Sequence, residues 1–554
     1  MIVRKEGVAD LFGHECCWRS PRREVYWAGM LYVPGRPVGR PSVEAFAAAI
    51  DRTGLAAAAE LLRGHFFLAV RDLAERTVHV FVDRSAIFGG FRSDTAVSTS
   101  FLDLVRREGL SGSQLDPEAV VDFVNCGYIP GGRTFFPAIR TVSAEHVLTF
   151  SADGKVRPAW RRDTDITRPS GLSDVAAFFQ ELVESLRGTR VSVDLTGGID
   201  SRLVATLLGY FGLEFETAVS GWDERMADVA VARQVAGALG RELFVTRHRV
   251  EDLEGQMDSL FGIADGIADV IGFHRLVQNQ RQRLARGAEL AISGIGGEMH
   301  KDYWWLQDFP FYARRKANLK RLVGLRMVPI GFDGDSFGPD YARASRGLRE
   351  RILADLGRYV LETNTRTYDN IYFNGKMKTV ACRSLTLQGR VVPTFAPLAD
   401  LDVVRCGFAL PRGQRVFDRW HRKLMTRYNP HVARIRSASG GGTVSAQTAD
   451  LLMDVGKYVA DRTKRAVKKA GEKVLRRTIL LPRPDHPRLW ETARSCPRVG
   501  ACFERLSAEG VLGPALSPHD VADRHLGKLV TVAMLLEFLD RKPAAAADRG
   551  PANG

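Results

Sequence analysis

From residue 173 onward the chain alternates two kinds of segment, and this alternation constrains the fold more than any other feature. Short apolar runs typical of strands are separated by longer segments with helical periodicity. Such alternation predicts a parallel β-sheet covered by helices. The predicted strands are residues 190–195, 214–220, 242–247 and 289–293. The predicted helices are residues 201–210, 227–239 and 274–286. Beyond about residue 310 the sequence predicts mostly helices with irregular connections.

The region before residue 160 has a different pattern, which predicts a separate layered α+β domain. Its strand-like runs are residues 24–28, 66–70, 78–82 and 146–150. Its helix-like runs are residues 42–51 and 117–125. A length of 554 residues also favours more than one hydrophobic core. The predicted organisation is a first domain at 1–160, a linker, a second domain at 173–541 and a disordered tail at 542–554.

Composition excludes several classes of protein. The chain has no apolar run long enough to cross a membrane and no apolar run of a signal peptide near its start, so we expect a cytoplasmic protein without membrane insertion. Its seven cysteines include no CxxC pair, which argues against a disulfide framework and a structural zinc site. The net charge of +15 indicates an anionic partner but does not choose among nucleotide, acidic peptide, nucleic acid and protein.

One turn between a predicted strand and a predicted helix contains the residue types of a phosphate- and metal-binding site. Adjacent glycines let the backbone approach an anion, and the N-terminus of the following helix stabilises phosphate charge. Hydroxyl groups can donate to phosphate, and a carboxylate can hold a Mg²⁺ ion that bridges the phosphates. The residues of this turn are Leu195, Thr196, Gly197, Gly198, Ile199, Asp200 and Ser201. By itself the motif fits an ATP site and an ordinary capped Gly-Gly turn about equally well.

The turn resembles the Ser-Gly-Gly-x-Asp-Ser pyrophosphate loop of the asparagine synthetase family, with Thr196 in place of the first serine. Residues 218–221, which include Val219, are similar to the strand end that contacts adenine in this family. The stretch Ser293, Gly294, Ile295, Gly296, Gly297 and Glu298 is similar to a second acidic segment of the family. The resemblance spans roughly residues 20–440, and in its amino-terminal part the chain looks like the family's glutaminase domain.

This resemblance implies a fold, a reaction and a set of site residues. The implied fold is α/β: a glutaminase-like (Ntn-type) α+β sandwich followed by a parallel-sheet ATP-pyrophosphatase domain, adenine nucleotide α-hydrolase-like, with a helical extension. The implied enzyme uses ATP and Mg²⁺ to activate a carboxylate as acyl-AMP, and an amine then displaces AMP. The resemblance assigns both metal-ligand roles to Asp200 and Glu298. The implied ATP contacts are the turn residues 195–201 together with Val219, Ser293 and Gly294.

Several residues depart from the family pattern. The family's glutaminase attacks glutamine with an N-terminal cysteine, but Ile2 occupies the corresponding position here, and Cys16 and Cys17 are internal. Ile295 replaces a glutamate and cannot transfer protons. The sequence does not place a substitute base. For the cation that stabilises acyl transfer, Arg436 is the candidate and Lys423 the alternative.

Family branches without the cysteine include β-lactam synthetases and lasso-peptide macrolactam synthetases. We therefore predict amide-bond formation within one substrate, in natural-product biosynthesis. A precursor peptide is a possible substrate, and a leader-peptide-binding protein or protease a possible partner. Nucleic acid is not expected, because no nucleic-acid domain is recognisable. An ammonia-dependent amidotransferase similar to asparagine synthetase and a non-catalytic nucleotide- or peptide-binding pseudoenzyme remain alternatives.

The sequence favours structural roles for one further helix and four further residues. A basic amphipathic helix at 457–477 is predicted to present a solvated face and to pack its apolar stripe on the second domain. Trp304 and Trp305 are predicted to lie in the core rather than in an acceptor pocket. His274 and His300 are predicted to be structural.

Overall fold

The computed structural model describes residues 1–10, 15–221, 223–438, 441–475, 487–514 and 516–541. The predicted disordered tail at 542–554 lies outside these described residues, as do the last two residues of the predicted basic helix.

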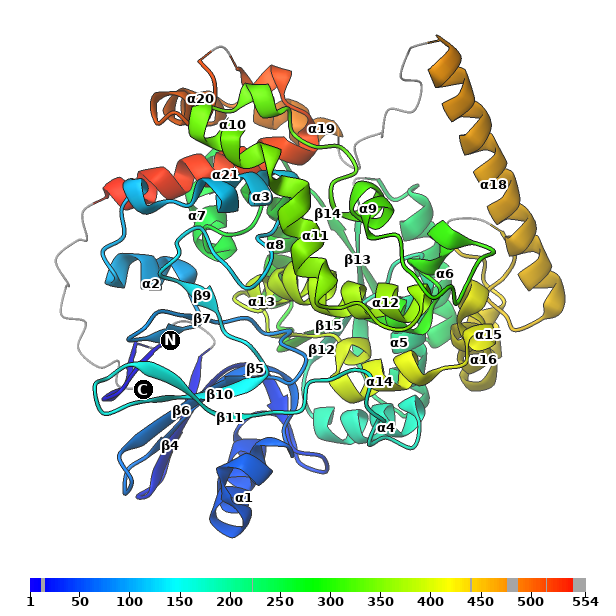
Figure 1. The fold of residues 1–554 in the computed structure, drawn as a ribbon. Coiled ribbons are helices and arrows are strands. Elements are labelled where there is room, and N and C mark those ends of the chain that lie inside the picture. Colours follow the sequence, from blue (N-terminus) through cyan, green and yellow to red (C-terminus); the bar gives the residue numbers. More distant parts are fainter. Residues whose placement is uncertain (11–14, 222, 439–440, 476–486, 515, 542–554) are drawn as a thin grey trace.

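Two antiparallel sheets form the amino-terminal region (Figure 1). One sheet has the order β2-β1-β8-β7-β9, and its strands are β2 (Gly7–Asp10), β1 (Ile2–Arg4), β8 (Val97–Ser98), β7 (Phe91–Arg92) and β9 (Arg140–Thr141). The other has the order β11-β10-β6-β5-β4-β3, and its strands are β11 (Val156–Arg161), β10 (His146–Phe150), β6 (Thr77–Val82), β5 (Arg63–Asp72), β4 (Arg23–Tyr32) and β3 (Cys16–Arg19). The predicted α+β layering is thus confirmed for this region.

Alternation of side chains along β4 explains how the two sheets pack. Val25 and Trp27 join the apolar cluster beneath helix α1 (Arg40–Ala59), whereas Tyr26 and Ala28 join the cluster between the two sheets. A strand sends successive side chains to opposite faces, so a strand buried on both faces carries apolar residues continuously. The resulting layers are a helix, the long sheet and the short sheet. Helices α2 (Phe101–Arg107) and α3 (Pro117–Cys126) follow the short strands.

The second sheet system is fully parallel, as the alternating pattern predicts. Its order is β14-β13-β12-β15-β16, with strands β14 (Leu243–Arg247), β13 (Phe215–Gly221), β12 (Val191–Asp194), β15 (Leu290–Ile292) and β16 (Thr394–Phe395). Strands β14, β12 and β15 lie within their predicted ranges, and β13 ends one residue beyond its predicted range of 214–220. The fifth, β16, is two residues long and lies in a region predicted to be mostly helical, so its apolar pattern was too short to reveal it.

The strand order reverses direction at the centre of this sheet. The chain passes from β12 to β13 and β14 on one side, and then returns to place β15 on the other side of β12. In open parallel sheets such a reversal leaves a crevice at the carboxyl ends of the two diverging strands, and ligands bind there. The predicted turn after β12 and the predicted acidic segment after β15 both begin at this crevice.

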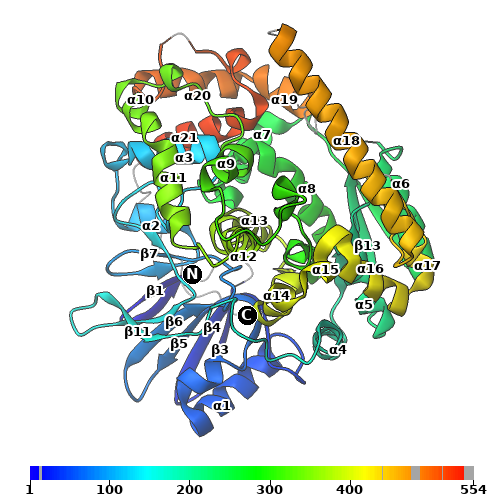
Figure 2. The ribbon, with the colours of Figure 1, turned by 45° about the vertical axis from the view of Figure 1, so that its right-hand side comes forward.

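Helices cover both faces of the parallel sheet, as Figures 1 and 2 show. One apolar cluster joins strand residues to helices α4 (Val175–Leu186), α5 (Ile199–Tyr210), α6 (Ala227–Leu239) and α17 (Pro430–Ala433). On the other face lies α8 (Val270–Ala285), whose Arg283 Nε donates to Ser192 Oγ at 3.1 Å.

The remaining chain is mostly helical, as expected beyond residue 310. These helices are α7 (Leu253–Ala264), α9 (Leu319–Leu322), α10 (Pro339–Arg346), α11 (Leu348–Gly357), α12 (Asn364–Ile371), α13 (Cys382–Gln388), α14 (Leu401–Ala409), α15 (Arg412–Arg415), α16 (Arg419–Tyr428), α18 (Thr448–Leu475), α19 (Pro487–Arg494), α20 (Pro497–Ala508) and α21 (Asp523–Asp540), with a π-helical segment η6 (Tyr372–Ala381). In the part of the chain that the structure describes, no helix combines the length and apolarity needed to span a membrane.

Buried polar contacts join the amino-terminal sheets to the second region. Asp265 accepts hydrogen bonds from the backbone N–H groups of Phe101 and Leu102 at the start of α2, at 2.7 and 3.2 Å. His65 Nε2 lies 3.1 Å from the carbonyl oxygen of Ala396, just after β16. These contacts fix the first region against the edge of the parallel sheet.

Candidate active site

The turn between β12 and α5 is arranged for contact with an anion. Thr196 N donates to Ser201 Oγ at 3.0 Å, and Gly198 N donates to Thr196 Oγ1 at 3.2 Å, so the turn's own hydroxyl groups hold its shape. Gly197 N donates to the carboxylate of Asp228 at 3.1 Å. No side chain caps the N-terminus of α5. Its first N–H groups therefore remain available to phosphate oxygens, and a backbone N–H of this turn already binds an anionic oxygen.

The acidic segment after β15 packs directly against this turn. A β-carbon on Gly294 would lie 2.5 Å from Ser201 N, and one on Gly297 would lie 2.2 Å from Asp200 Oδ1. Contacts this short leave no room for a side chain, so glycine is required at both positions. The structure thereby brings together the two motifs that the sequence assigns to one site.

Asp200 lies at the centre of a charged cluster. Its Oδ2 accepts a hydrogen bond from Lys301 Nζ at 2.6 Å, and His421 Nε2 lies 2.9 Å from its Oδ1. Burial by itself would raise the pKa of this carboxyl group, but Lys301 and His421 outweigh it and hold the pKa well below its usual range. Asp200 is therefore an anion at any physiological pH.

Neighbouring carboxylates and a hydrogen bond to its backbone hold Lys301 in this position. Burial disfavours its ammonium charge, but Asp200, Asp418 and Glu298 raise its pKa above the ordinary lysine value. Arg415 donates from Nη2 to the carbonyl oxygen of Lys301 at 2.8 Å. The lysine is thus a fixed positive charge beside the turn.

Glu298 is the second buried carboxyl group of the cluster. Its Oε2 accepts a hydrogen bond from Gly296 N at 3.1 Å. Burial and the nearby charge of Asp200 raise its pKa. Ile295 lies in the same segment and packs against an apolar cluster that includes Met299 and Phe373. Ile295 therefore belongs to this apolar cluster.

A cavity of about 470 Å³ opens beside these residues. Its lining includes the glycines of the turn, charged groups and an aromatic wall: Gly197, Gly198, Ile199, Asp228, Lys301, Asp302, Tyr303, Leu306, Phe417, Asp418, Arg422, Ser437, Ala438, Val444, Asp454, Lys457, Tyr458 and Asp461. A volume of this size lies in the range of small-molecule and cofactor sites.

The basic helix α18 contributes to this cavity at its amino-terminal end. Tyr458 OH donates to the carbonyl oxygen of Leu306 at 3.0 Å, and its ring packs edge-on against Phe417 with ring centroids 5.9 Å apart. The rest of the helix stands away from the body of the molecule in Figure 1. Val459 is 50% exposed and Val467 is 65% exposed. The prediction that the apolar stripe packs on the second domain is therefore wrong for these two residues, whose side chains are exposed to solvent.

The other residues predicted to contact ATP lie around the same crevice. Leu195 and Val219 are buried in the apolar cluster of the parallel sheet, so only their backbone can face a ligand. Ser293 Oγ accepts a hydrogen bond from Ile295 N at 3.4 Å and supports the acidic segment.

The two predicted cation candidates lie outside the lining of this cavity. The side chain of Arg436 is exposed, and its backbone carbonyl accepts a hydrogen bond from Arg202 at 3.2 Å. Lys423 is bonded to Gln414 Oε1 at 3.1 Å on an exposed surface. The segment that follows Arg436 does reach the turn, because Ala438 N donates to the carbonyl oxygen of Gly197 at 3.1 Å. The role of Arg436 stays a prediction.

The structural interpretations of four residues agree with the geometry. Trp304 and Trp305 are buried, and Trp305 Nε1 donates to Asp369 at 3.0 Å. His300 is buried and stacks on Trp420. Burial lowers the pKa of His274 to about 4, so this imidazole is neutral and serves as a core hydrogen-bonding group.

Sequence reasoning missed four residues at the site: Lys301, Asp302, Arg415 and His421. Lys301 and Asp302 follow Glu298 closely, so their distance from the acidic segment was a usable signal. His421 and Arg415 come from a region more than two hundred residues after the turn, and no local pattern marks them.

The fold and the site together define a nucleotide-binding α/β domain with a phosphate-binding turn at the reversal point of a parallel sheet. Residues 179–317 match the family model described as asparagine synthase, and this stretch contains both the turn and the acidic segment. The chain thus contains an asparagine synthase domain at these residues. No curated protein matches the chain. The domain implies an ATP-dependent carbon–nitrogen ligase that forms amides through an adenylated carboxylate.

Proposed function

We propose that this ligase joins the activated carboxylate to an amine of the same substrate molecule, as β-lactam and macrolactam synthetases do in natural-product biosynthesis. The observation that carries the proposal is the cluster of Asp200, Glu298 and Lys301 at the crevice, combined with raised pKa values for six of the seven cysteines, which disfavour thiolate attack on glutamine. A precursor peptide and a leader-peptide-binding protein or protease belong to this proposal as its possible substrate and partners.

The cysteines support the part of the proposal that concerns the amine. Burial is the main cause that raises the pKa of six of the seven cysteines, including Cys16 and Cys17 in the amino-terminal sheets. A thiol attacks an amide as its thiolate, and a raised pKa suppresses that form. The amino-terminal region is therefore proposed to be a glutaminase-like sandwich without glutaminase chemistry, so the amine must come from the substrate or from solution.

The residues of the turn fit ATP in residue type and geometry. The uncapped N-terminus of α5 and the close-packed Gly197 suit phosphate groups, and Lys301 supplies a fixed positive charge beside them. Asp200 and Glu298 would hold Mg²⁺, which binds proteins through one or two carboxylates together with substrate phosphates. Burial and the charge of Asp200 raise the pKa of Glu298, and a bound cation would relieve the repulsion between the two carboxylates. When bound, Mg²⁺ neutralises phosphate charge.

In the proposed reaction, residues of this chain position the reacting groups. Lys301 is placed to stabilise negative charge that develops as pyrophosphate leaves. The aromatic side chains of Tyr303, Phe417 and Tyr458 line the cavity and limit the access of water, which would hydrolyse an acyl-adenylate.

Asp302 is our proposed base for the attacking amine. It lines the cavity, and Phe417 N lies 3.4 Å from its Oδ2. Burial and the neighbouring charge of Asp418 raise its pKa to about 6, which suits a group that accepts a proton near neutral pH.

The raised pKa of Asp302 predicts how the rate of amide formation depends on pH. The carboxyl group is protonated and inactive as a base below its pKa of about 6, so the rate of amide formation should rise as the pH increases through that value. Asp302→Asn should lower this rate by roughly a hundredfold and remove that rise, given the usual contribution of a general base. Exchange of labelled pyrophosphate into ATP should change little, because it reports only adenylation. Equal losses in exchange and amide formation would instead mean that Asp302 supports the fold of the site.

The reaction class can be tested with purified protein, ATP, Mg²⁺ and candidate substrates that carry both a carboxylate and an amine. The expected result is AMP and pyrophosphate together with a product that has lost one water, detected by mass spectrometry. An amidated product formed only when ammonium is added would instead favour the ammonia-dependent amidotransferase. Binding of ATP without pyrophosphate exchange for any candidate would contradict the proposal and favour a binding module.

A further inference from the structure

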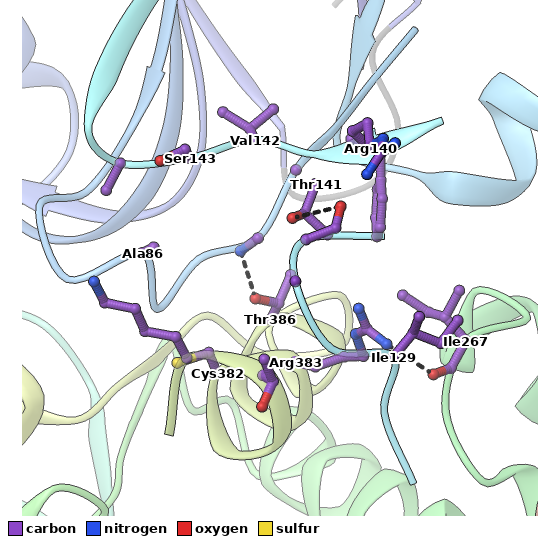
Figure 3. Close-up of a pocket in the computed structure, with 18 of the residues that line it drawn as sticks. Ala86, Ile129, Arg140, Thr141, Val142, Ser143, Ile267, Cys382, Arg383 and Thr386 are labelled. Atoms are coloured by element: carbon purple, nitrogen blue, oxygen red, sulfur yellow. Dashed lines mark hydrogen bonds between the residues drawn. The ribbon is translucent and has the colours of Figure 1, made fainter. Parts of the chain in front are cut away.

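A second and larger cavity lies between the amino-terminal sheets and the second region. It has a volume of about 670 Å³. Figure 3 shows Arg140, Thr141, Val142 and Ser143 along one wall, with Cys382, Arg383 and Thr386 of α13 on the opposite wall. It shares no lining residue with the cavity beside Asp200. It is thus a separate site built from both regions of the chain.

The lining of this second cavity is strongly basic. Six basic residues face three acidic ones: Arg92, Arg140, Arg358, Lys378, Arg383 and Arg390 against Glu145, Asp265 and Asp355. Two of the acidic residues are already paired with lining arginines, because Asp265 Oδ2 lies 2.9 Å from Arg390 Nη2 and Asp355 forms an ion pair with Arg358. Glu145 is exposed at the rim. Positive charge therefore remains in excess inside the cavity.

Two of the remaining cations are partly buried and, within the described residues, have no direct ion pair. Within the described residues, Lys378 Nζ has no carboxylate within ion-pair distance, and it lies 4.7 Å from the ring centroid of Phe373. Arg383 donates one hydrogen bond, from Nη1 to the carbonyl oxygen of Ile267 at 3.3 Å. Burial lowers the pKa of Lys378, and it lowers that of Arg383 to about 10.

A buried charge without a direct ion-pair partner is costly in a folded protein. A chain that gained nothing from these cations would be more stable with neutral side chains at both positions. An anion bound between them would offset the cost of burying them, because guanidinium and ammonium groups make their strongest hydrogen bonds to carboxylate and phosphate oxygens. Arg140 and Arg92 on the strand side can supply a second set of donors to the same ligand.

We propose that this cavity binds a small metabolite carrying carboxylate or phosphate groups, held between Lys378 and Arg383 on one wall and Arg92 and Arg140 on the other. The volume excludes a folded partner and suits a molecule of metabolite size. This site is independent of the ATP site and does not depend on the reaction proposed above.

The test is titration calorimetry of the full-length protein with citrate and, separately, with inorganic phosphate, at constant ionic strength. Citrate represents carboxylate ligands and phosphate represents phosphorylated ones. Saturable binding of at least one probe is expected, and the probe that binds more tightly identifies the chemical class. The double variant Lys378→Gln/Arg383→Gln should weaken that binding at least tenfold, equivalent to about 1.4 kcal/mol, because it removes two charge-assisted contacts.

The matched control is Arg315→Gln/Lys316→Gln, which makes the same change in charge at two exposed side chains outside the cavity. It should bind the probe as the unmodified protein does. Asp200→Asn should also keep the binding, which distinguishes the second cavity from the phosphate-binding turn. Absence of saturable binding of both probes, or equal affinity in the double variant and its control, would overturn the proposal.

Thermal unfolding measurements distinguish a variant that has lost binding from one that fails to fold. Without added anion, the single variant Lys378→Met should unfold at the same temperature as the unmodified protein or higher, since it removes a buried unpaired charge. The probe should raise the melting temperature of the unmodified protein and leave that of the double variant nearly unchanged. A marked loss of stability in Lys378→Met without any probe would show that Lys378 has a structural partner, and would also overturn the proposal.

Discussion

Asp200→Asn is expected to lower the rate of ATP–pyrophosphate exchange by about a thousandfold, or about 4 kcal/mol of transition-state stabilisation. Asp200 belongs to the phosphate-binding turn, and its carboxylate contacts both Lys301 and His421. Asparagine keeps its shape but removes the charge that would hold a metal ion on the phosphates. Steady-state exchange with a substrate carboxylate gives the measurement.

Two controls separate catalysis from folding in this experiment. Glu289→Gln removes an exposed carboxylate next to β15, at the end of the sheet opposite the crevice, and should leave exchange unchanged. Asp200→Asn also leaves the buried Lys301 ammonium unpaired, so some loss of stability is expected. The double variant Asp200→Asn/Lys301→Met should recover stability without recovering exchange. If exchange returned with stability, Asp200 would be a folding residue and its catalytic assignment would be wrong.

Gly297→Ala is expected to lower exchange by about a hundredfold, because the new β-carbon would lie 2.2 Å from Asp200 Oδ1. The carboxylate must then move, and displacement of a positioned group by about an ångström typically costs this much. Overpacking should also destabilise the fold by about 1–3 kcal/mol. Exchange kinetics and chemical denaturation measure the two effects.

The matched control for this substitution is Gly237→Ala. Gly237 lies within α6, and a β-carbon there would meet nothing within 4 Å. Alanine should therefore stabilise the protein by about 0.5–1 kcal/mol through helix propensity, with exchange unchanged. An unaltered rate in Gly297→Ala would mean that the acidic segment can shift away from Asp200, and would remove the argument for close packing of the two motifs.

The sequence alone determined the parallel sheet and the place of its main turn. The alternation of apolar and amphipathic segments predicted four of the five strands, and α6 matches its predicted range of 227–239. These are local properties, because strand and helix periodicities depend on neighbouring residues. The turn of residues 195–201 was also recognisable locally, since its glycines and polar side chains are contiguous.

The pKa values at the site and the exposure of the helix stripe depend on contacts between elements that are distant in the sequence. His421 reaches Asp200 across more than two hundred residues, and the perturbed pKa values of Asp200, Glu298 and Asp302 arise from burial and from charges on distant elements. Val459 and Val467 carry the pattern of a packed stripe, yet they are exposed. Periodicity specifies that a helix has an apolar face, whereas the approach of other elements specifies whether that face and each buried charge find a partner.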